Sequence, residues 1–208
     1  MRRARRLPLE ELAPYLLPVP EEPRPFSWSA VFGNDHPVEI EVGCGKGLFL
    51  LTSAQTQPQV NFLGIEIERK YQLFAATRMA KRGLSNVRLV KADARFFLRA
   101  FVAAGSCQAV HVYFPDPWWK TRHRKCRVFT PEFAAQCERV LKPGGWLHLA
   151  TDVEEYFGVM TRLLAEQTGL RRLPIARTSE VGQDDFLTNF ERKARLQGKM
   201  IYRARFER

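Results

Sequence analysis

Two features that this chain lacks, a long apolar run and paired cysteines, exclude several classes of protein. No stretch reaches the 18 consecutive apolar residues typical of a membrane-spanning helix, so we expect no membrane association. The four cysteines are far apart and show no CxxC spacing: Cys44, Cys107, Cys126 and Cys137. That spacing argues against a zinc site and against a disulfide framework. We therefore expect no bound metal and a reducing, cytoplasmic environment.

The sequence also lacks internal repeats, a low-complexity linker and an ordinary signal peptide. Glu10, Glu11 and Pro14 interrupt the leucines where a signal peptide would be continuously apolar. With 208 residues, 45% of them hydrophobic, the chain can form one domain with a sizeable core. We divide it into a basic, proline-rich arm over residues 1–27 and a single domain over residues 28–208, and we expect the prolines to keep residues 14–25 extended over the domain surface.

Acidic residues are fewer than basic ones, and the excess of positive charge is local. The net charge is +11, and 16 of the 33 Lys and Arg residues lie within residues 1–6, 120–127 and 192–208. Glu207 is the one acidic residue in those stretches, and the rest of the chain has a net charge of −4. Such local basicity is typical of a surface that binds a polyanion. The alternative is that the three basic stretches are solvent-exposed edges of the protein that bind nothing.

Strand-like and helix-like segments alternate through most of the chain. We expect strands at residues 38–42, 60–67, 86–92, 109–114 and 146–151. We expect helices at residues 48–55, 70–83, 94–102, 130–145 and 152–167. This alternation predicts an α/β fold with a doubly wound, mostly parallel sheet. Two last strands, at about 169–176 and 199–207, have no obvious helix between them and predict an added antiparallel hairpin.

The first glycine-rich loop, "EVGCGKG" at residues 41–47, lies between an expected strand and an expected helix. Gly43, Gly45 and Gly47 allow positive φ and a close approach of the backbone to a ligand. Leu48 occupies the place where a dinucleotide fingerprint has its third glycine, which argues against a nicotinamide-dependent dehydrogenase. Glu41 would repel a pyrophosphate but suits a ligand with sulfonium and ammonium groups, which favours S-adenosylmethionine as the cofactor.

Two further acids end the next two strands. Glu66 is placed to accept hydrogen bonds from ribose hydroxyls, and Asp93 is placed to accept one from an adenine amino group. Either acid alone could be an ordinary solvated strand end. Because the carboxyl ends of parallel strands meet at one edge, three such acids in succession predict one binding crevice.

The segment "YFPDPWWKTRHRKCR", residues 113–127, combines a carboxylate, aromatic rings and a dense run of cations. Pro115 and Pro117 hold Asp116 rigidly at the end of the fourth strand. We interpret Asp116 as facing an acceptor base, with a tryptophan beside it, although a turn residue and core tryptophans would also fit. The cations that follow can bind a phosphate backbone: Lys120, Arg122, Arg124, Lys125 and Arg127.

Several of these motifs together resemble one known family, the bacterial tRNA (guanine-N7)-methyltransferases. The similar segments are "WSAVFGNDHPVEIEVGCGKG" (28–47), "GIEI" (64–67), "KADA" (91–94), "FPDPWWKTRHRKCR" (114–127), "ATD" (150–152) and "TNFERKARLQGKMIYRARF" (188–206). The resemblance implies a class I methyltransferase fold and methyl transfer to N7 of guanine 46 in the tRNA variable loop.

The resemblance also implies roles for particular residues. The expected donor contacts are Glu41, Glu66, Asp93 and Asp116, and Asp116 would also be the active-site residue. The expected substrate contacts are Lys120, Asp152, Thr188, Asn189, Phe190 and Glu191. The chain departs from the family at Trp119, usually Pro or His, and at Cys126, usually Arg. For residues 188–191 the alternative is a capping box, with Thr188 as N-cap and Glu191 three residues later.

Guanine N7 has a lone pair and no proton, so its methylation requires alignment more than a general base. We therefore expect Asp116 to accept hydrogen bonds and to stabilise charge that develops on the base. The alternatives are a methyltransferase for an amino nitrogen or a small molecule, and a non-catalytic RNA-binding domain.

Overall fold

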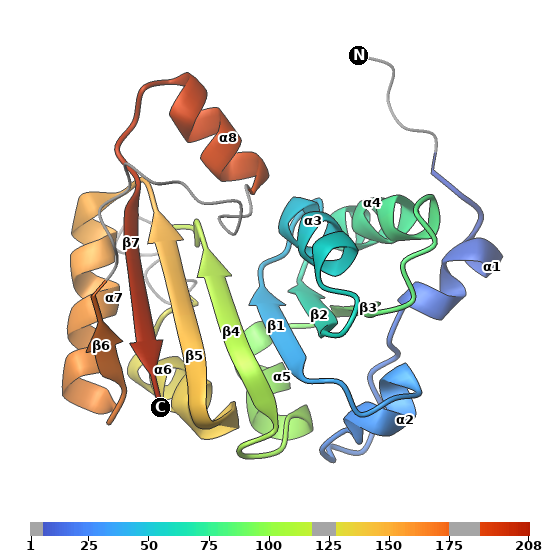
Figure 1. Ribbon diagram of the computed structural model, residues 1–208, viewed down its shortest axis with the longest axis horizontal. Coiled ribbons are helices and arrows are strands. Elements are labelled where there is room, and N and C mark those ends of the chain that lie inside the picture. Colours follow the sequence, from blue (N-terminus) through green and yellow to red (C-terminus); the bar gives the residue numbers. More distant parts are fainter. Residues whose placement is uncertain (1–5, 118–127, 175–187) are drawn as a thin grey trace.

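The computed structural model describes residues 6–117, 128–174 and 188–208. Its centre is a seven-stranded sheet with the order β3-β2-β1-β4-β5-β7-β6 (Figure 1). The strands are β1 (Val38–Val42), β2 (Asn61–Glu66), β3 (Val87–Lys91), β4 (Cys107–Tyr113), β5 (Leu141–Thr151), β6 (Arg171–Leu173) and β7 (Tyr202–Glu207). The first five strands are parallel, and β7 runs antiparallel to both β5 and β6. The predicted α/β sheet and its antiparallel C-terminal pair are confirmed.

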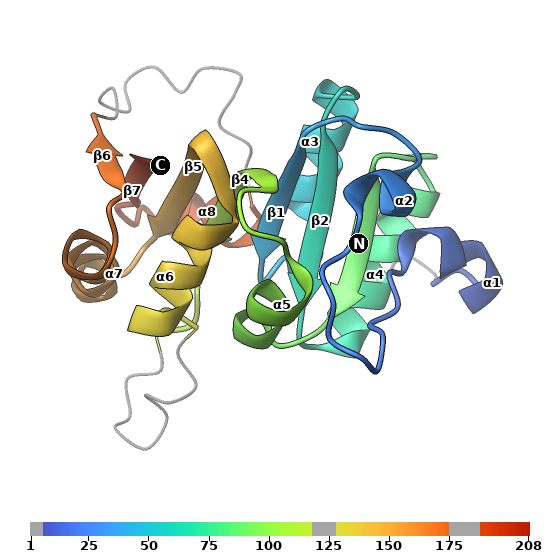
Figure 2. The ribbon, with the colours of Figure 1, turned by 90° about the horizontal axis from the view of Figure 1, so that it is seen from below.

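Helices cover both faces of the sheet (Figure 2). They are α1 (Leu9–Leu12), the 3₁₀ turn η1 (Ala13–Tyr15), α2 (Trp28–Phe32), α3 (Leu48–Thr56), α4 (Arg69–Ala80), α5 (Ala94–Phe101), α6 (Pro131–Val140), α7 (Glu154–Gln167) and α8 (Asn189–Leu196). One apolar core joins α5, α6 and α7 to the sheet, and a second joins α3 and α4 to β2 and β3. Two covered faces explain why the inner strands are almost continuously buried.

The N-terminal arm runs along β3, which is one of the two edge strands of the sheet. Leu12 is fully buried against α4, and the Leu17 N–H donates to the Leu89 carbonyl at 2.9 Å. Farther along, the Phe26 N–H donates to the Phe101 carbonyl at 2.9 Å. The arm therefore satisfies part of an otherwise open strand edge.

The expected helix at 130–145 is too long, because α6 ends at Val140 and residues 141–145 belong to β5. Leu141 is fully buried and pairs with Cys107 of β4 before the register shifts. At Gly145 a Cβ would lie 2.8 Å from the Lys142 carbonyl oxygen and 2.9 Å from that of Gln108, so glycine is required there. A Pro-Gly-Gly sequence ends a helix and also permits a bulged strand, and pairing with β4 selects the strand.

A helix, α8, separates β6 from β7, where the sequence showed no obvious helix beyond the alternative of a capping box at residues 188–191. This helix buries only Glu191 and Ala194, so it has no apolar stripe that a sequence pattern could reveal. Its predicted N-cap is confirmed, since the Thr188 hydroxyl accepts from the Glu191 N–H at 3.0 Å. The expected helix at 70–83 ends on Gly83 in the left-handed conformation, with φ of 61°, and the Gly83 N–H donates to the Ala80 carbonyl at 3.1 Å. The helix expected from residue 152 begins later, because Val153 is the N-cap of α7.

No helix in the described part of the chain is both long and apolar enough to cross a membrane.

Candidate active site at the carboxyl edge of the sheet

The glycine loop joins β1 to α3 and exposes its backbone at the carboxyl edge of the sheet. Gly43, Gly45 and Gly47 all have positive φ, between 53° and 73°. A Cβ at Gly47 would lie 2.8 Å from the Cβ of Ala75, so this glycine lets α3 pack closely on α4. At Gly43, in contrast, no heavy atom of a described residue lies within 4 Å of such a Cβ. The start of the loop is therefore open to a ligand that approaches the backbone.

Glu41, the last acid of β1, is a buried carboxylate for which the described residues supply no cation. Its side chain is 4% exposed, and its Oε2 atom has no hydrogen-bond partner among them. Burial, followed by the nearby charge of Glu66, raises the pKa of Glu41 well above its usual range. Such a group destabilises the fold unless it takes up a proton or a cationic partner.

Glu66, at the end of β2, is held by two backbone donors. Its Oε2 accepts from the Gly45 N–H at 2.8 Å, and its Oε1 accepts from the Glu68 N–H at 2.9 Å. These bonds tie the glycine loop to the second strand. Each carboxylate oxygen can accept a further hydrogen bond, so Glu66 can also bind ligand hydroxyls.

Asp93 caps α5 through the Arg95 N–H at 2.8 Å, and it also pairs with the Arg95 guanidinium. The side-chain hydrogen bond from Arg95 is the main cause that lowers the pKa of Asp93. The two residues border a cavity of about 450 Å³ between α5 and α6, which Arg99 and Phe133 also line. Arg95 contacts both oxygens of Asp93, so an adenine amino group would share this carboxylate with it.

The end of β4 has a strained residue. Phe114 has φ of 50°, the single positive φ of a non-glycine residue in the described chain. This conformation costs about 1–2 kcal/mol, and it turns the chain sharply out of the sheet. Pro115, Asp116 and Pro117 follow, and Asp116 is exposed with no hydrogen bond or ion pair to a described residue. Asp116 therefore lies just past the carboxyl end of β4, the strand that pairs with β1.

Helix α8 brings an aromatic ring over this edge. It lies beyond the ends of β4 and β5, on the side toward α3 (Figure 1). Phe190, 57% exposed, stacks on Phe114 with ring centroids 6.4 Å apart and an interplanar angle of 19°. The same ring lies 4.0 Å from the Cβ position of Gly45. Phe190 thus connects the glycine loop with the turn that contains Asp116.

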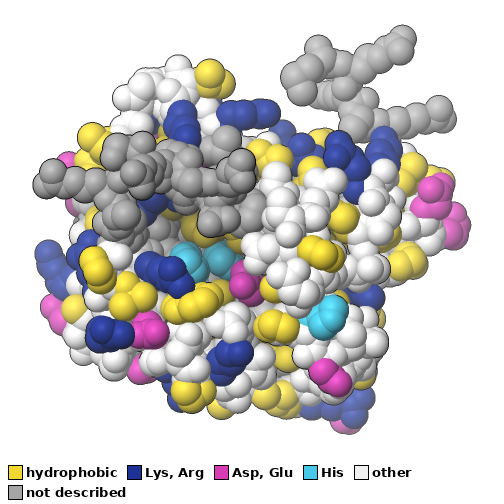
Figure 3. All heavy atoms as spheres, viewed as in Figure 1, with side chains coloured by type: hydrophobic (Ala, Val, Ile, Leu, Met, Phe, Trp, Pro, Cys, Tyr) yellow, Lys and Arg dark blue, Asp and Glu magenta, His cyan; other side chains and the backbone are white. Residues whose placement is uncertain are grey.

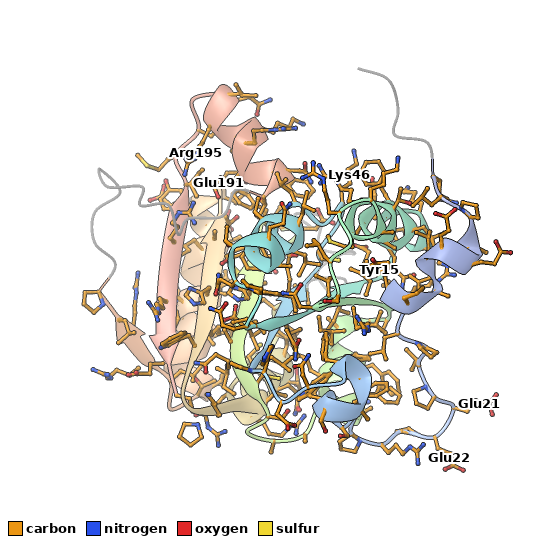
Figure 4. All side chains as sticks on the ribbon, turned by 45° about the vertical axis from the view of Figure 1, so that its right-hand side comes forward. Tyr15, Glu21, Glu22, Lys46, Glu191 and Arg195 are labelled. Carbon is orange, nitrogen blue, oxygen red and sulfur yellow. The ribbon has the colours of Figure 1, made fainter. Side chains whose placement is uncertain are left out.

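Two ion-pair systems hold α8 and the turn after it in place. Glu191 is 1% exposed, and its Oε1 lies 2.6 Å from Arg203 of β7 and 2.5 Å from Arg195 (Figure 4). Asp152 pairs with Lys199 at 2.7 Å. Both acids were expected from the resemblance to contact substrate. The geometry gives each of them an intramolecular cation as well.

The structure brings most of the expected residues to one edge. Glu41, Glu66 and the glycine loop lie together where β1 and β2 end, since Glu66 accepts from the Gly45 N–H. Phe190 lies near Gly45 and stacks on Phe114, two residues before the exposed Asp116. Lys120, Arg122, Arg124, Lys125, Arg127, Trp119 and Cys126 lie outside the described residues. Sequence reasoning missed Phe114, because no residue pattern encodes its positive φ. It also missed Arg203, which it counted only as part of a basic tail.

The crevice fits S-adenosylmethionine. The Glu41 carboxylate, which has an oxygen without a described partner, matches the positive charge of the donor, and the open backbone at Gly43 allows close approach. Glu66 retains acceptor capacity for ribose hydroxyls.

Comparisons with known proteins agree with this geometry. A family model described as "Putative methyltransferase" matches residues 35–204. A tRNA (guanine-N(7)-)-methyltransferase of Rhodopirellula baltica is 43% identical over 195 residues, which cover 90% of this chain and 72% of the relative. A tRNA (guanine-N(7)-)-methyltransferase of Myxococcus xanthus is 35% identical over 199 residues, which cover 92% of this chain and 96% of the relative.

Among solved structures, an aminoglycoside resistance methyltransferase aligns with a TM-score of 0.55 at 22% identity, covering 82% of this chain and 86% of that one. At this identity the likeness shows the fold alone. The sequence relatives go further: the chain belongs to the tRNA (guanine-N(7)-)-methyltransferase family.

Proposed function

We propose that this protein transfers the methyl group of S-adenosylmethionine to N7 of guanine 46 in the variable loop of tRNA, in the cytoplasm. Family membership supports the reaction and the tRNA substrate. One structural observation carries the residue assignment. Phe190 stacks on Phe114, and its ring lies 4.0 Å from the position of a Cβ at Gly45, which supports a donor site and an Asp116 turn that face the same space.

On the donor side, the acids of the first three strands have separate roles. When bound, S-adenosylmethionine supplies an electrophilic methyl group on a sulfonium centre. Glu41 offers a negative charge to that cation. The cation in turn offsets the cost of burying the ionised Glu41 side chain, and this adds to binding. Glu66 accepts from the ribose hydroxyls while it keeps the Gly45 N–H in place. Asp93 accepts from the adenine amino group.

On the acceptor side, the N7 lone pair needs no deprotonation, so these residues position the base. Asp116 accepts hydrogen bonds from the guanine or the donor and stabilises positive charge that develops on the base. Phe190 and Phe114 offer ring faces on which the base can stack. Because Glu191 is buried between two arginines, it acts by holding α8, whereas Thr188, Asn189 and Phe190 lie at the start of that helix.

The remaining substrate contacts rest on the family resemblance. Asp152 is paired with Lys199 at the end of β5, and it would contact substrate from there. Lys120 would lie next to the target base. Arg122, Arg124, Lys125 and Arg127 would contact phosphates.

The experiment is incubation of unmodified tRNA with labelled S-adenosylmethionine, followed by nucleoside analysis. We expect 7-methylguanosine at position 46 and no methylated amino group. The matched control is the same tRNA with 7-deazaguanine at position 46, which has carbon in place of N7 and keeps the Watson–Crick edge. Label transfer to the control tRNA at a near-normal rate would point to an exocyclic or ribose acceptor and would overturn the proposal.

A further inference from the structure

A second basic surface lies on α4, and most of its described cations come from outside the three basic stretches of the sequence. It is a hollow of about 360 Å³ between α4, the glycine loop and the start of the described chain. Among the described residues, its lining has five cations and no acid: Arg6, Lys46, Lys70, Phe74, Thr77, Arg78 and Lys81. Figure 3 shows Lys and Arg side chains close together over this part of the molecule. Counting charges along the sequence missed it, because residues 7–119 taken together are not basic.

Aromatic rings hold several of these cations in position. The Lys46 ammonium lies 5.6 Å from the centroid of the Phe74 ring, and the Arg78 guanidinium lies 5.7 Å from it. Arg78 also donates to the Lys46 carbonyl at 3.1 Å, which links α4 to the glycine loop. The Lys70 ammonium lies 4.9 Å from the Tyr71 ring. Cations held in this way lose less conformational entropy when they bind an anion.

The spacing of the cations matches an extended polyanion. Lys70 and Arg78 lie on one side of α4, because positions three, four, seven and eight apart share a helix face, and Lys81, the C-cap, follows Arg78 by three residues. At 1.5 Å per residue they extend over about 16 Å of the helix axis. The acid that pairs with Lys70 is Glu68, at 3.8 Å, and both side chains are exposed, so this pair has little strength.

A cation of α8 lies close enough to the hollow to affect one of its arginines. Burial, followed by the charges of Arg192 and Arg82, lowers the pKa of Arg78. Arg192 belongs to α8, so cations of α4 and α8 lie close enough to repel one another. Lys46 lies beside α4 (Figure 4). An anionic chain that passes Phe190 would therefore meet positive charge on both sides.

We propose that the α4 hollow is a second binding site for the phosphate backbone of tRNA, which it grips on the side of the donor crevice opposite β7. This inference rests on the proposed function for the identity of the RNA. A polyphosphate ligand explains why like charges gather here, since it offsets their mutual repulsion and releases counterions. An RNA that spans α4 and α8 would be held near Phe190, with the target base directed toward Asp116.

The test replaces two cations of the hollow, in the double variant Lys70→Gln and Lys81→Gln. We measure the affinity for unmodified tRNA from about 50 to 200 mM salt, with the affinity for S-adenosylmethionine and the thermal midpoint as checks on the fold. The matched control is Lys142→Gln with Arg162→Gln, which removes the same charge at exposed positions on β5 and α7. We expect the slope of log affinity against log salt to fall by about 1.4 to 1.8 units in the first variant, since each of two lost phosphate contacts contributes about 0.7–0.9.

The control variant should keep the slope within about 0.5 unit of wild type. The proposal would be overturned by an unchanged slope in the hollow variant, or by an equal decrease of the slope in the hollow and control variants. A further arm adds inorganic phosphate at constant ionic strength. Phosphate-specific stabilisation of the wild type, together with an unchanged tRNA slope, would assign the hollow to a small anion and would also overturn it. Binding is measured without methyl transfer, so this result is independent of which atom is methylated.

Discussion

Glu41 at the end of β1 and Glu191 on α8 are both hidden from solvent, at 4% and 1% exposure, but their surroundings are opposite. Glu191 has two arginines within 2.6 Å. Among the described residues, Glu41 has no cationic partner, one oxygen without a hydrogen bond, and a second acid, Glu66, nearby. A buried carboxylate is stable when its own chain supplies the countercharge, and otherwise it must receive one from a ligand or take up a proton.

This difference separates a carboxylate that stabilises the fold from one that is available to bind a ligand. Arg203 lies on β7 and Arg195 on α8, so the Glu191 cluster joins two elements that surround the site. Glu41 makes no such link in the described structure, and it lies at the strand end that leads into the glycine loop. The charge at Glu191 should therefore matter for folding, whereas the charge at Glu41 should matter for the donor.

Asp116 gives the strongest test of this difference, because it is an exposed carboxylate that supports no described contact. We expect Asp116→Ala to lower turnover about 10²- to 10³-fold, the usual effect of removing one group that stabilises transition-state charge. Affinity for tRNA should stay within about twofold, since distant phosphates carry it. Single-turnover kinetics and filter binding measure the two quantities. Equal thermal midpoints for Asp116→Ala and wild type are the control, and a turnover within tenfold of wild type would remove Asp116 from the reaction.

Loss of the Glu191 cluster should have the next largest effect. We expect Glu191→Ala to lower the free energy of unfolding by about 1.5–3 kcal/mol, because Arg203 and the partly exposed Arg195 lose their common charged acceptor. Glu191→Gln keeps an acceptor and should lose about half as much. Denaturant unfolding measures both changes. If neither variant loses stability while both lose turnover, Glu191 contacts substrate directly and the comparison with Glu41 fails.

The smallest effect should come from Glu41→Gln. At high pH and without donor, this substitution should leave the protein as stable or more stable, whereas the Glu191 substitutions should lower its stability. Because burial raises the pKa of Glu41 above its unfolded value, ionisation of Glu41 destabilises the folded protein as pH rises. Without donor, the variant should thus be at least as stable as wild type at pH 8. The stability of wild type relative to the variant should increase as pH falls toward 5 and Glu41 takes up a proton. Thermal unfolding at the two pH values measures this change.

Calorimetry provides the second half of that test. We expect Glu41→Gln to bind S-adenosylmethionine about tenfold more weakly, the value of one charged hydrogen bond of about 1.5 kcal/mol. Asp35→Asn, an exposed acid remote from the crevice, is the control substitution. A variant that is less stable at every pH, with normal donor affinity, would make Glu41 a structural residue like Glu191.

Several features of the fold and the site can be predicted from the amino-acid sequence alone. They are the order of strands and helices in the parallel part of the sheet, the glycine loop, and the acids that end β1, β2 and β3. These features depend on side-chain period and on glycine, which act over a few neighbouring residues. Parallel strands then bring their carboxyl ends to one edge, so the sequence is enough to place Glu41, Glu66 and Asp93 at the same edge of the sheet. It does not show that Asp93 pairs with Arg95 and borders a cavity between α5 and α6.

Other features depend on tertiary contacts. Helix α8 lacks an apolar stripe, and it is held by Glu191 against Arg203 and by Phe190 against Phe114. The strained φ of Phe114 and the strand at 141–145 likewise depend on partners far away in sequence. The cations around Phe74 come from the glycine loop, α4 and the N-terminal arm. Contacts between distant segments leave no local pattern, because each half of such a contact is an ordinary residue until folding brings it to the other.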